Sequence, residues 1–110
     1  MSALYQMRYQ GVTGVGHGAV YVGKGVVVGV DVTGARYKGT YATGANGGLN
    51  GTVTLISAGG VLVTGQPIPA GTTVPIILAL PANFGNGAFH TVSVGGNPVQ
   101  VAFDKIDDIP

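Results

Sequence analysis

The chain has 110 residues, which is enough for one domain with a modest core, and its net charge is only +1. Charged side chains make up 8% of it, against roughly 25% in a typical soluble domain. So weak and balanced a charge gives no reason to expect direct binding to nucleic acid. The absence of cysteine excludes disulfides, thiolate nucleophiles and thiolate-bound metals.

The first third of the chain contains three segments that we predict to be antiparallel strands, at residues 3–12, 17–22 and 26–32. In the first, Tyr5, Met7 and Tyr9 alternate with polar residues, which is typical of a half-buried strand. Glycine-rich turns separate the three segments.

Residues 36–41 and 49–55 alternate in the same way and predict the fourth and fifth strands. The next segment, residues 57–73, holds two prolines and four glycines, and we expect a long connection with one brief strand or turn of helix. Residues 74–80 are continuously apolar, which indicates a strand covered on both faces.

Residues 89–94 and 99–106 complete the predicted set, and residues 107–110 are expected to be a frayed tail. Eight short strands without a helical periodicity predict an all-β domain over residues 1–106. We expect an eight-stranded up-and-down antiparallel barrel, lipocalin-like, because closure removes sheet edges that so few charges could not protect.

Alternation also predicts which side chains face the interior. The predicted inward set is Tyr5, Met7, Tyr9, Val26, Val28, Val30, Tyr37, Tyr41, Leu49, Val53, Leu55, Ile76, Leu78, Leu80, Val99, Val101 and Phe103. Gly39 and Gly51 fall on the same faces and subtract volume there. We therefore expect a small, partly apolar cavity near Tyr37, Gly39, Tyr41 and Gly51, where the tyrosine hydroxyls would need polar partners such as water, Asp31 or a ligand.

The residues Leu4-Tyr5-x-Met7-x-Tyr9, Gly14-x-Gly16-x-Gly18, Gly29-x-Asp31 and Tyr37-x-Gly39-x-Tyr41 resemble the GrlR-type small β-barrels, negative regulators of type III secretion. The resemblance implies a lipocalin-like homodimeric barrel that acts through a protein partner. In the founding regulator, an acidic run between the fourth and fifth strands is associated with binding a transcriptional activator. The matching segment here, residues 43–48, carries no acid, so this chain departs from the family at that point.

A catalytic or metal site finds little support in the residue types. His17 and His90 are the only histidines, no serine stands in a Gly-x-Ser-x-Gly elbow, and no histidine pair has ligand spacing. Asp31 is interpreted as a turn aspartate that binds nearby backbone N–H groups, or as a polar group at the barrel mouth. We predict a non-enzymatic protein without a cofactor or metal.

The apolar strand at residues 74–80 predicts a homodimer, because a closed barrel buries only one of its faces. The expected interface contains Ile77 and Ala79, extended by Val92 and Val94.

Two functions remain open from the sequence. The first is a protein-interaction or regulatory module, and the second is a lipocalin-like binding protein for a small apolar ligand. The first ten residues lack the apolar segment of a secretory signal, and no apolar run is long enough to span a membrane, so we expect a cytoplasmic protein with no membrane partner.

Overall fold

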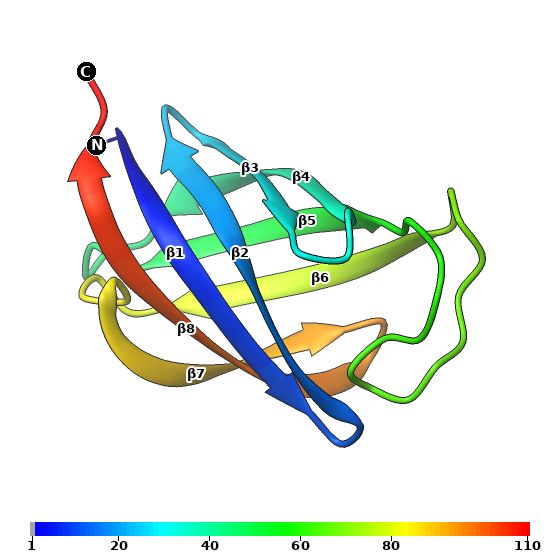
Figure 1. Cartoon of the computed structure of the whole chain (residues 1–110). Helices are drawn as coiled ribbons and strands as arrows, with labels where there is room; N and C mark the ends of the chain where they lie inside the picture. Colours follow the sequence, from blue (N-terminus) through cyan, green and yellow to red (C-terminus); the bar gives the residue numbers. More distant parts are fainter. Residues whose placement is uncertain (1) are drawn as a thin grey trace.

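The computed structural model describes residues 2–110 and shows a closed barrel of eight antiparallel strands (Figure 1). The strands follow one another around the barrel in chain order, and β8 pairs with β1 to close it. They are β1 (Ser2–Gly11), β2 (Gly14–Gly23), β3 (Val26–Asp31), β4 (Arg36–Thr43), β5 (Leu49–Ile56), β6 (Thr73–Leu80), β7 (Asn86–Val94) and β8 (Asn97–Asp108).

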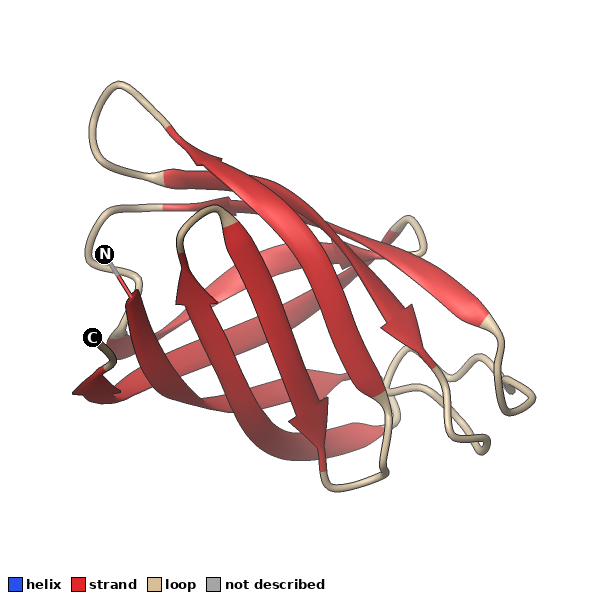
Figure 2. Cartoon of the chain, turned by 90° about the horizontal axis from the view of Figure 1, so that it is seen from above, coloured by secondary structure: helices blue, strands red, loops and turns tan. Residues whose placement is uncertain are grey.

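This up-and-down topology confirms the predicted fold class, and it is the architecture of lipocalin-like barrels. Strands and loops account for all of residues 2–110 (Figure 2). That part of the chain therefore contains no helix that is long and apolar enough to cross a membrane.

The two ends of the barrel differ in their connections. At one end lie both chain termini and the turns β2–β3, β4–β5 and β6–β7, and we call it the closed end. At the other end, which we call the open end, the long connection of residues 57–72 joins β5 to β6 (Figure 1). Within that connection, Val61 and Pro67 form an isolated bridge, so the brief strand or turn of helix expected there is reduced to a single pair of residues.

The barrel interior is the hydrophobic core, and most of the predicted inward set is confirmed. Tyr9 and Tyr41 are partly buried and pack against the core, and the other members found inside are Tyr5, Met7, Tyr37, Leu49, Val53, Leu55, Ile76, Leu78, Leu80, Val99, Val101 and Phe103. On β6 the alternation is strict, with Ile76 and Leu78 buried and Ile77 and Ala79 exposed.

The prediction was wrong for β3, where the facing of the side chains is opposite to the expected one. Val26, Val28 and Val30 lie on the outer surface, and Val27 and Asp31 are buried. A shift of one residue exchanges the two faces of a strand. The run of valines suits either face, and in the barrel Asp31 lies inside, hydrogen-bonded to Tyr9 and Tyr37.

The interface prediction was wrong for Val92 and Val94, which are buried in the barrel. On β7 the polar residues Thr91 and Ser93 take the outer positions, so the valines between them face inward. The inward valines belong to the lumen and cannot extend an outer patch around Ile77.

The tail also differs from the prediction, because β8 continues through residues expected to be frayed. Asp107 pairs with Leu4 and Asp108 with Ala3, and the Ile109 N–H donates to the Ser2 carbonyl at 2.8 Å. Pairing with the whole of β1 holds this segment, so the barrel extends to Asp108 rather than to residue 106.

Candidate functional site

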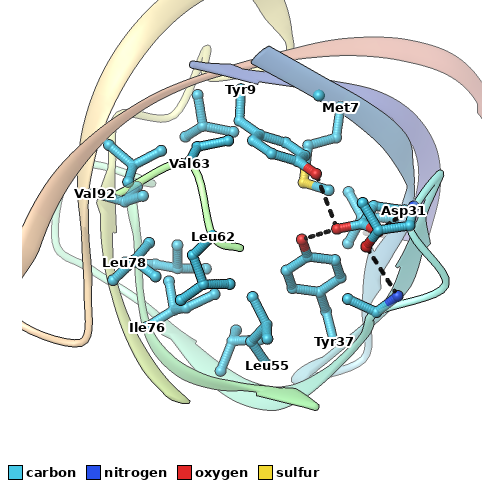
Figure 3. Close-up of a pocket in the computed structure, with 18 of the residues that line it drawn as sticks. Met7, Tyr9, Asp31, Tyr37, Leu55, Leu62, Val63, Ile76, Leu78 and Val92 are labelled. Atoms are coloured by element: carbon cyan, nitrogen blue, oxygen red, sulfur yellow. Dashed lines mark hydrogen bonds between the residues drawn. The ribbon is translucent and has the colours of Figure 1, made fainter. Parts of the chain in front are cut away.

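The barrel encloses a cavity of about 330 Å³. At the closed end, it is bounded by the rings of Phe84 and Phe103, which pack with the ring of Tyr5 into a cluster that we call the aromatic plug. Phe84 lies 5.0 Å from Tyr5 and 5.6 Å from Phe103 between ring centres, the second pair edge to face. The wall above the plug is mainly aliphatic, and its side chains converge on the lumen in Figure 3, among them Met7, Leu55, Ile76, Leu78 and Val92.

One group of polar side chains interrupts this apolar wall. Asp31 at the end of β3 is 8% exposed, and its Oδ2 accepts hydrogen bonds from the hydroxyls of Tyr9 (3.0 Å) and Tyr37 (2.5 Å). Tyr9 comes from β1 and Tyr37 from β4, so the group joins three strands along one side of the lumen (Figure 3). We call Tyr9, Asp31 and Tyr37 the polar trio.

The other carboxylate oxygen of Asp31 is bound by the β3–β4 turn. Its Oδ1 accepts from the backbone N–H of Thr33 at 2.9 Å and from the Thr33 hydroxyl at 2.5 Å. Gly34 follows with a φ of +86°, a conformation that suits glycine in a turn. Asp31 is thus the predicted turn aspartate and also a polar group in the cavity wall.

A glycine on β2 makes room for Tyr9 to reach Asp31. Tyr9 pairs with Gly16, and a Cβ at Gly16 would lie 2.3 Å from Cζ of the Tyr9 ring. The ring therefore lies directly over the β2 backbone, and on β3, the strand beyond β2, it meets Asp31. The glycine-rich segment that the sequence suggested was a turn is here a contact surface for an aromatic ring.

Burial and the nearby carboxylate keep both tyrosines protonated. Burial is the main cause that raises the pKa of Tyr9 to about 12, and the charge of Asp31 acts in the same direction. Burial also raises the pKa of Tyr37, followed in size by its hydrogen bond to Asp31. Both hydroxyls are therefore hydrogen-bond donors to the carboxylate over the physiological pH range.

The long connection covers part of the open end. The Val63 carbonyl accepts from the backbone N–H of Thr13 at 3.0 Å, and the Leu62 carbonyl accepts from the Thr13 hydroxyl at 3.0 Å. Leu62 and Val63 line the cavity beside the aliphatic wall (Figure 3). A Cβ at Gly11 would lie 2.4 Å from the Val63 oxygen, so the glycine allows the connection to pass over β1.

The cavity reaches the surface between the loop tips of the open end. Among its lining residues, Val15 is 79% exposed, Val32 59% and Val61 64%. These valines belong to the β1–β2, β3–β4 and β5–β6 regions, respectively. An apolar molecule would meet an apolar entrance on its way to the lumen.

The predicted cavity residues fall into two groups. Asp31 and Tyr37 line the cavity, as expected, and Asp31 is the partner of the tyrosine hydroxyls. Gly39, Tyr41 and Gly51 are not among the residues that line it, so the prediction was wrong for these three. Tyr41 borders a separate pocket at the closed end.

The two glycines serve the sheet itself. A Cβ at Gly39 would lie 2.2 Å from the Thr52 oxygen, and a Cβ at Gly51 would lie 2.6 Å from the Thr40 oxygen. The volume that these glycines leave is filled by the neighbouring strand and does not enlarge the lumen.

Sequence reasoning missed the site roles of Tyr9, Thr33 and Leu62. The pairing of an inward tyrosine on β1 with a glycine on β2 was visible as Tyr9 and Gly16 around a short turn, and it could have indicated a ring crossing toward Asp31. Leu62 gave no such signal, because a loop residue has no periodicity that tells where it points.

Within residues 2–110, no group of three or more histidine and acidic side chains comes close enough together to hold a metal ion. Comparison of the chain with protein-family models, with curated proteins and with solved structures finds no match.

Proposed function

We propose that this barrel is a non-enzymatic binding protein for a small apolar molecule, which it holds in the lumen. The observation that carries the proposal is the cavity itself: about 330 Å³ with a largely aliphatic wall and one polar group. Ligand sites in proteins have this size and composition, with a few polar groups that orient the ligand. A cytoplasmic location remains a prediction from the sequence.

A neutral fluorescent probe, N-phenyl-1-naphthylamine, tests this function. We expect saturable fluorescence enhancement with one site per chain in the wild type. Val92→Phe, which places a ring in the lumen, should weaken binding at least about tenfold because it fills the space that the probe needs. Val28→Phe is the matched control, because Val28 lies on the outer face and is 49% exposed.

Equal probe binding by the two variants would contradict a site in the lumen, and the absence of saturable binding to the wild type would contradict the proposed function. Thermal unfolding of each variant shows whether the barrel is retained, so that a loss of binding is not mistaken for a loss of fold.

A second function, a homodimeric regulatory module that acts through a protein partner, follows from the resemblance to the GrlR-type barrels. The observation that favours it is an apolar outer patch on β2 and β3. Tyr21 pairs with Val28 and Ala19 with Val30, and Val28 and Val30 are each 49% exposed. Exposed apolar patches of this kind commonly mark protein interfaces.

Light scattering at micromolar concentration separates the candidate interfaces. We expect a dimer mass for the wild type. Val28→Lys places a charge on the outer patch of β2 and β3, and Ile77→Lys places one on the outer face of β6, where Ile77 is 52% exposed. The variant that returns a monomer identifies the interface. A monomer mass for the wild type would contradict the dimer.

A further inference from the structure

We propose that the lumen selects apolar amines, whose ammonium group would lie against the phenol oxygens of the polar trio. This inference rests on the proposed function and names the chemical class of its ligand. Three steps support it: the hydrogen-bond directions in the trio, the charge of Asp31, and the composition of the remaining wall.

The first step concerns hydrogen-bond capacity. A carboxylate has about four acceptor positions, and Asp31 uses them for Tyr9, Tyr37, and the backbone N–H and hydroxyl of Thr33. A phenol is a much weaker acid than a carboxylic acid, so the hydroxyl hydrogens stay on the tyrosines and point at Asp31. What the trio offers to the lumen is the lone pairs of two phenol oxygens.

Such a surface accepts hydrogen bonds and does not donate them. A ligand carboxylate or carbonyl would find no donor there, and it would lie beside an aspartate of the same charge. A hydroxyl or an ammonium group can donate to the phenol oxygens, and the ammonium has up to three hydrogens for the purpose.

The second step concerns charge. Within residues 2–110, the ion pairs join Arg8 to Asp104 and Lys105 to Asp108, and none involves Asp31. On β4, the strand that carries Tyr37, the basic side chains of Arg36 and Lys38 are exposed and alternate with the inward positions. The buried carboxylate therefore has hydrogen-bond donors but no counter-ion among the residues that the structure describes.

A buried charge without a counter-ion is costly, and a cation that approaches in a medium of low dielectric recovers part of that cost. This gain distinguishes an ammonium from a neutral hydroxyl at the same position. The rest of the wall, with side chains such as Leu55, Ile76 and Leu78, provides only apolar contact (Figure 3). The wall thus suits a hydrocarbon body attached to one cationic group.

Displacement of N-phenyl-1-naphthylamine by octylamine, octanol and octanoate at neutral pH tests the proposal, because the three share one chain length and differ in the head group. We expect octylamine to bind at least about tenfold more tightly than octanoate, as one hydrogen bond to a charged group predicts, and octanol to lie between them.

Asp31→Asn removes the charge at the trio, and Asp107→Asn makes the same change of net charge at the exposed end of β8. Octylamine should lose about tenfold in Asp31→Asn and keep its affinity in Asp107→Asn, whereas octanol should change little in either. If Asp31→Asn does not fold, the ranking in the wild-type protein still decides.

The outcomes separate the two proposals. If the probe binds but octanoate matches or exceeds octylamine, the amine preference is wrong and the apolar binding function stands. If octylamine binding survives in Asp31→Asn unchanged, the trio is not the recognition group. If the probe itself finds no saturable site, the proposed function fails together with its ligand class.

Discussion

The two ends of the barrel are built from the same sheet but filled in opposite ways. At the closed end, Tyr5, Phe84 and Phe103 pack ring against ring, and each is at most 5% exposed. At the open end, Tyr9 and Tyr37 turn their hydroxyls to Asp31, and about 330 Å³ is left open beside them. Aromatic residues close one end of the lumen and hold a polar site at the other.

The difference shows how one barrel can place residues that contribute to its stability at one end and residues that contribute to ligand binding at the other. A packed ring cluster removes apolar area from water, which favours folding. A cavity leaves part of the apolar wall without packing contacts, and a buried carboxylate is costly to desolvate. Such costs to stability are typical of functional sites. We therefore expect substitutions at the closed end to change stability first and those at the open end to change binding first.

The largest expected effect is at the aromatic plug. Phe84→Ala removes a side chain that is 3% exposed and should lower the free energy of unfolding by about 3–5 kcal/mol. Urea unfolding followed by tyrosine fluorescence measures the loss. Phe84 also lines the cavity, so the same truncation enlarges the lumen at the plug, while the polar trio is untouched.

Phe89→Ala is the matched control. Phe89 is 43% exposed on the outer face, and the Arg8 guanidinium lies 5.4 Å from the centre of its ring. Its loss should cost about 0.5–1 kcal/mol, the value of an exposed cation–π contact. Equal destabilisation by the two variants would contradict the contrast between the plug and the outer surface.

The next effect concerns a hydrogen bond of the polar trio. Tyr37→Phe removes a donor to the buried carboxylate of Asp31 and should cost about 1.5–3 kcal/mol, the value of hydrogen bonds to charged groups. Tyr41→Phe on the same strand is the control, because no side-chain hydrogen bond of Tyr41 is found within residues 2–110. Denaturant unfolding of both variants compares them, and a loss confined to Tyr41→Phe would contradict the assignment.

A smaller effect is expected where Tyr9 crosses β2. Gly16→Ala adds a Cβ that would lie 2.3 Å from the Tyr9 ring, so the ring must move away from Asp31. Overpacking costs about 1–3 kcal/mol. Because alanine lowers the conformational entropy of the unfolded chain, it offsets part of this cost, and the free energy of unfolding should fall by about 1–2 kcal/mol.

The matched control for that substitution is Gly44→Ala at the closed end. There the nearest atom to an added Cβ is the flexible Asn50 Nδ2 at 3.2 Å. Unfolding of the two variants in urea should show a loss for Gly16→Ala alone, together with weaker octylamine binding. An unchanged stability in Gly16→Ala would mean that the ring has room to shift without cost.

The fold could be predicted from the sequence because alternation and glycine turns are local signals. The continuous apolar run of residues 74–80 predicted β6, although its outer residues Ile77 and Ala79 are exposed in the barrel, and closure followed from the number of strands. The facing of β3 could not be predicted in the same way. Its valines fit either face, and Asp31 would be placed outside by polarity alone.

The site was accessible only in part, for a physical reason. Asp31 lies inside, where Tyr9 of β1 and Tyr37 of β4 donate to its carboxylate, and this compensation depends on three strands at once. The predicted cavity position relied on glycines as empty volume, whereas Gly39 and Gly51 accommodate a close neighbouring strand. Leu62 reaches the lumen from a loop, where no periodicity applies.

The last expected effect is the response of the polar trio to alkaline pH. In the unfolded chain, a tyrosine loses its proton near pH 10, but burial raises the pKa of Tyr9 to about 12 in the folded barrel. Between these values the unfolded state binds fewer protons than the folded one, so stability falls as pH rises. Below pH 10 the contribution is fully present, and it is lost as pH passes about 12.

Urea unfolding at several pH values measures the decline in the free energy of unfolding, and Tyr9→Phe should make this decline shallower than in the wild type. Tyr21→Phe, on the outer face of β2, serves as the comparison. If Tyr9→Phe shows the same slope as the wild type, the proton on Tyr9 is not linked to folding, and the hydrogen bond from Tyr9 to Asp31 contributes nothing to this dependence.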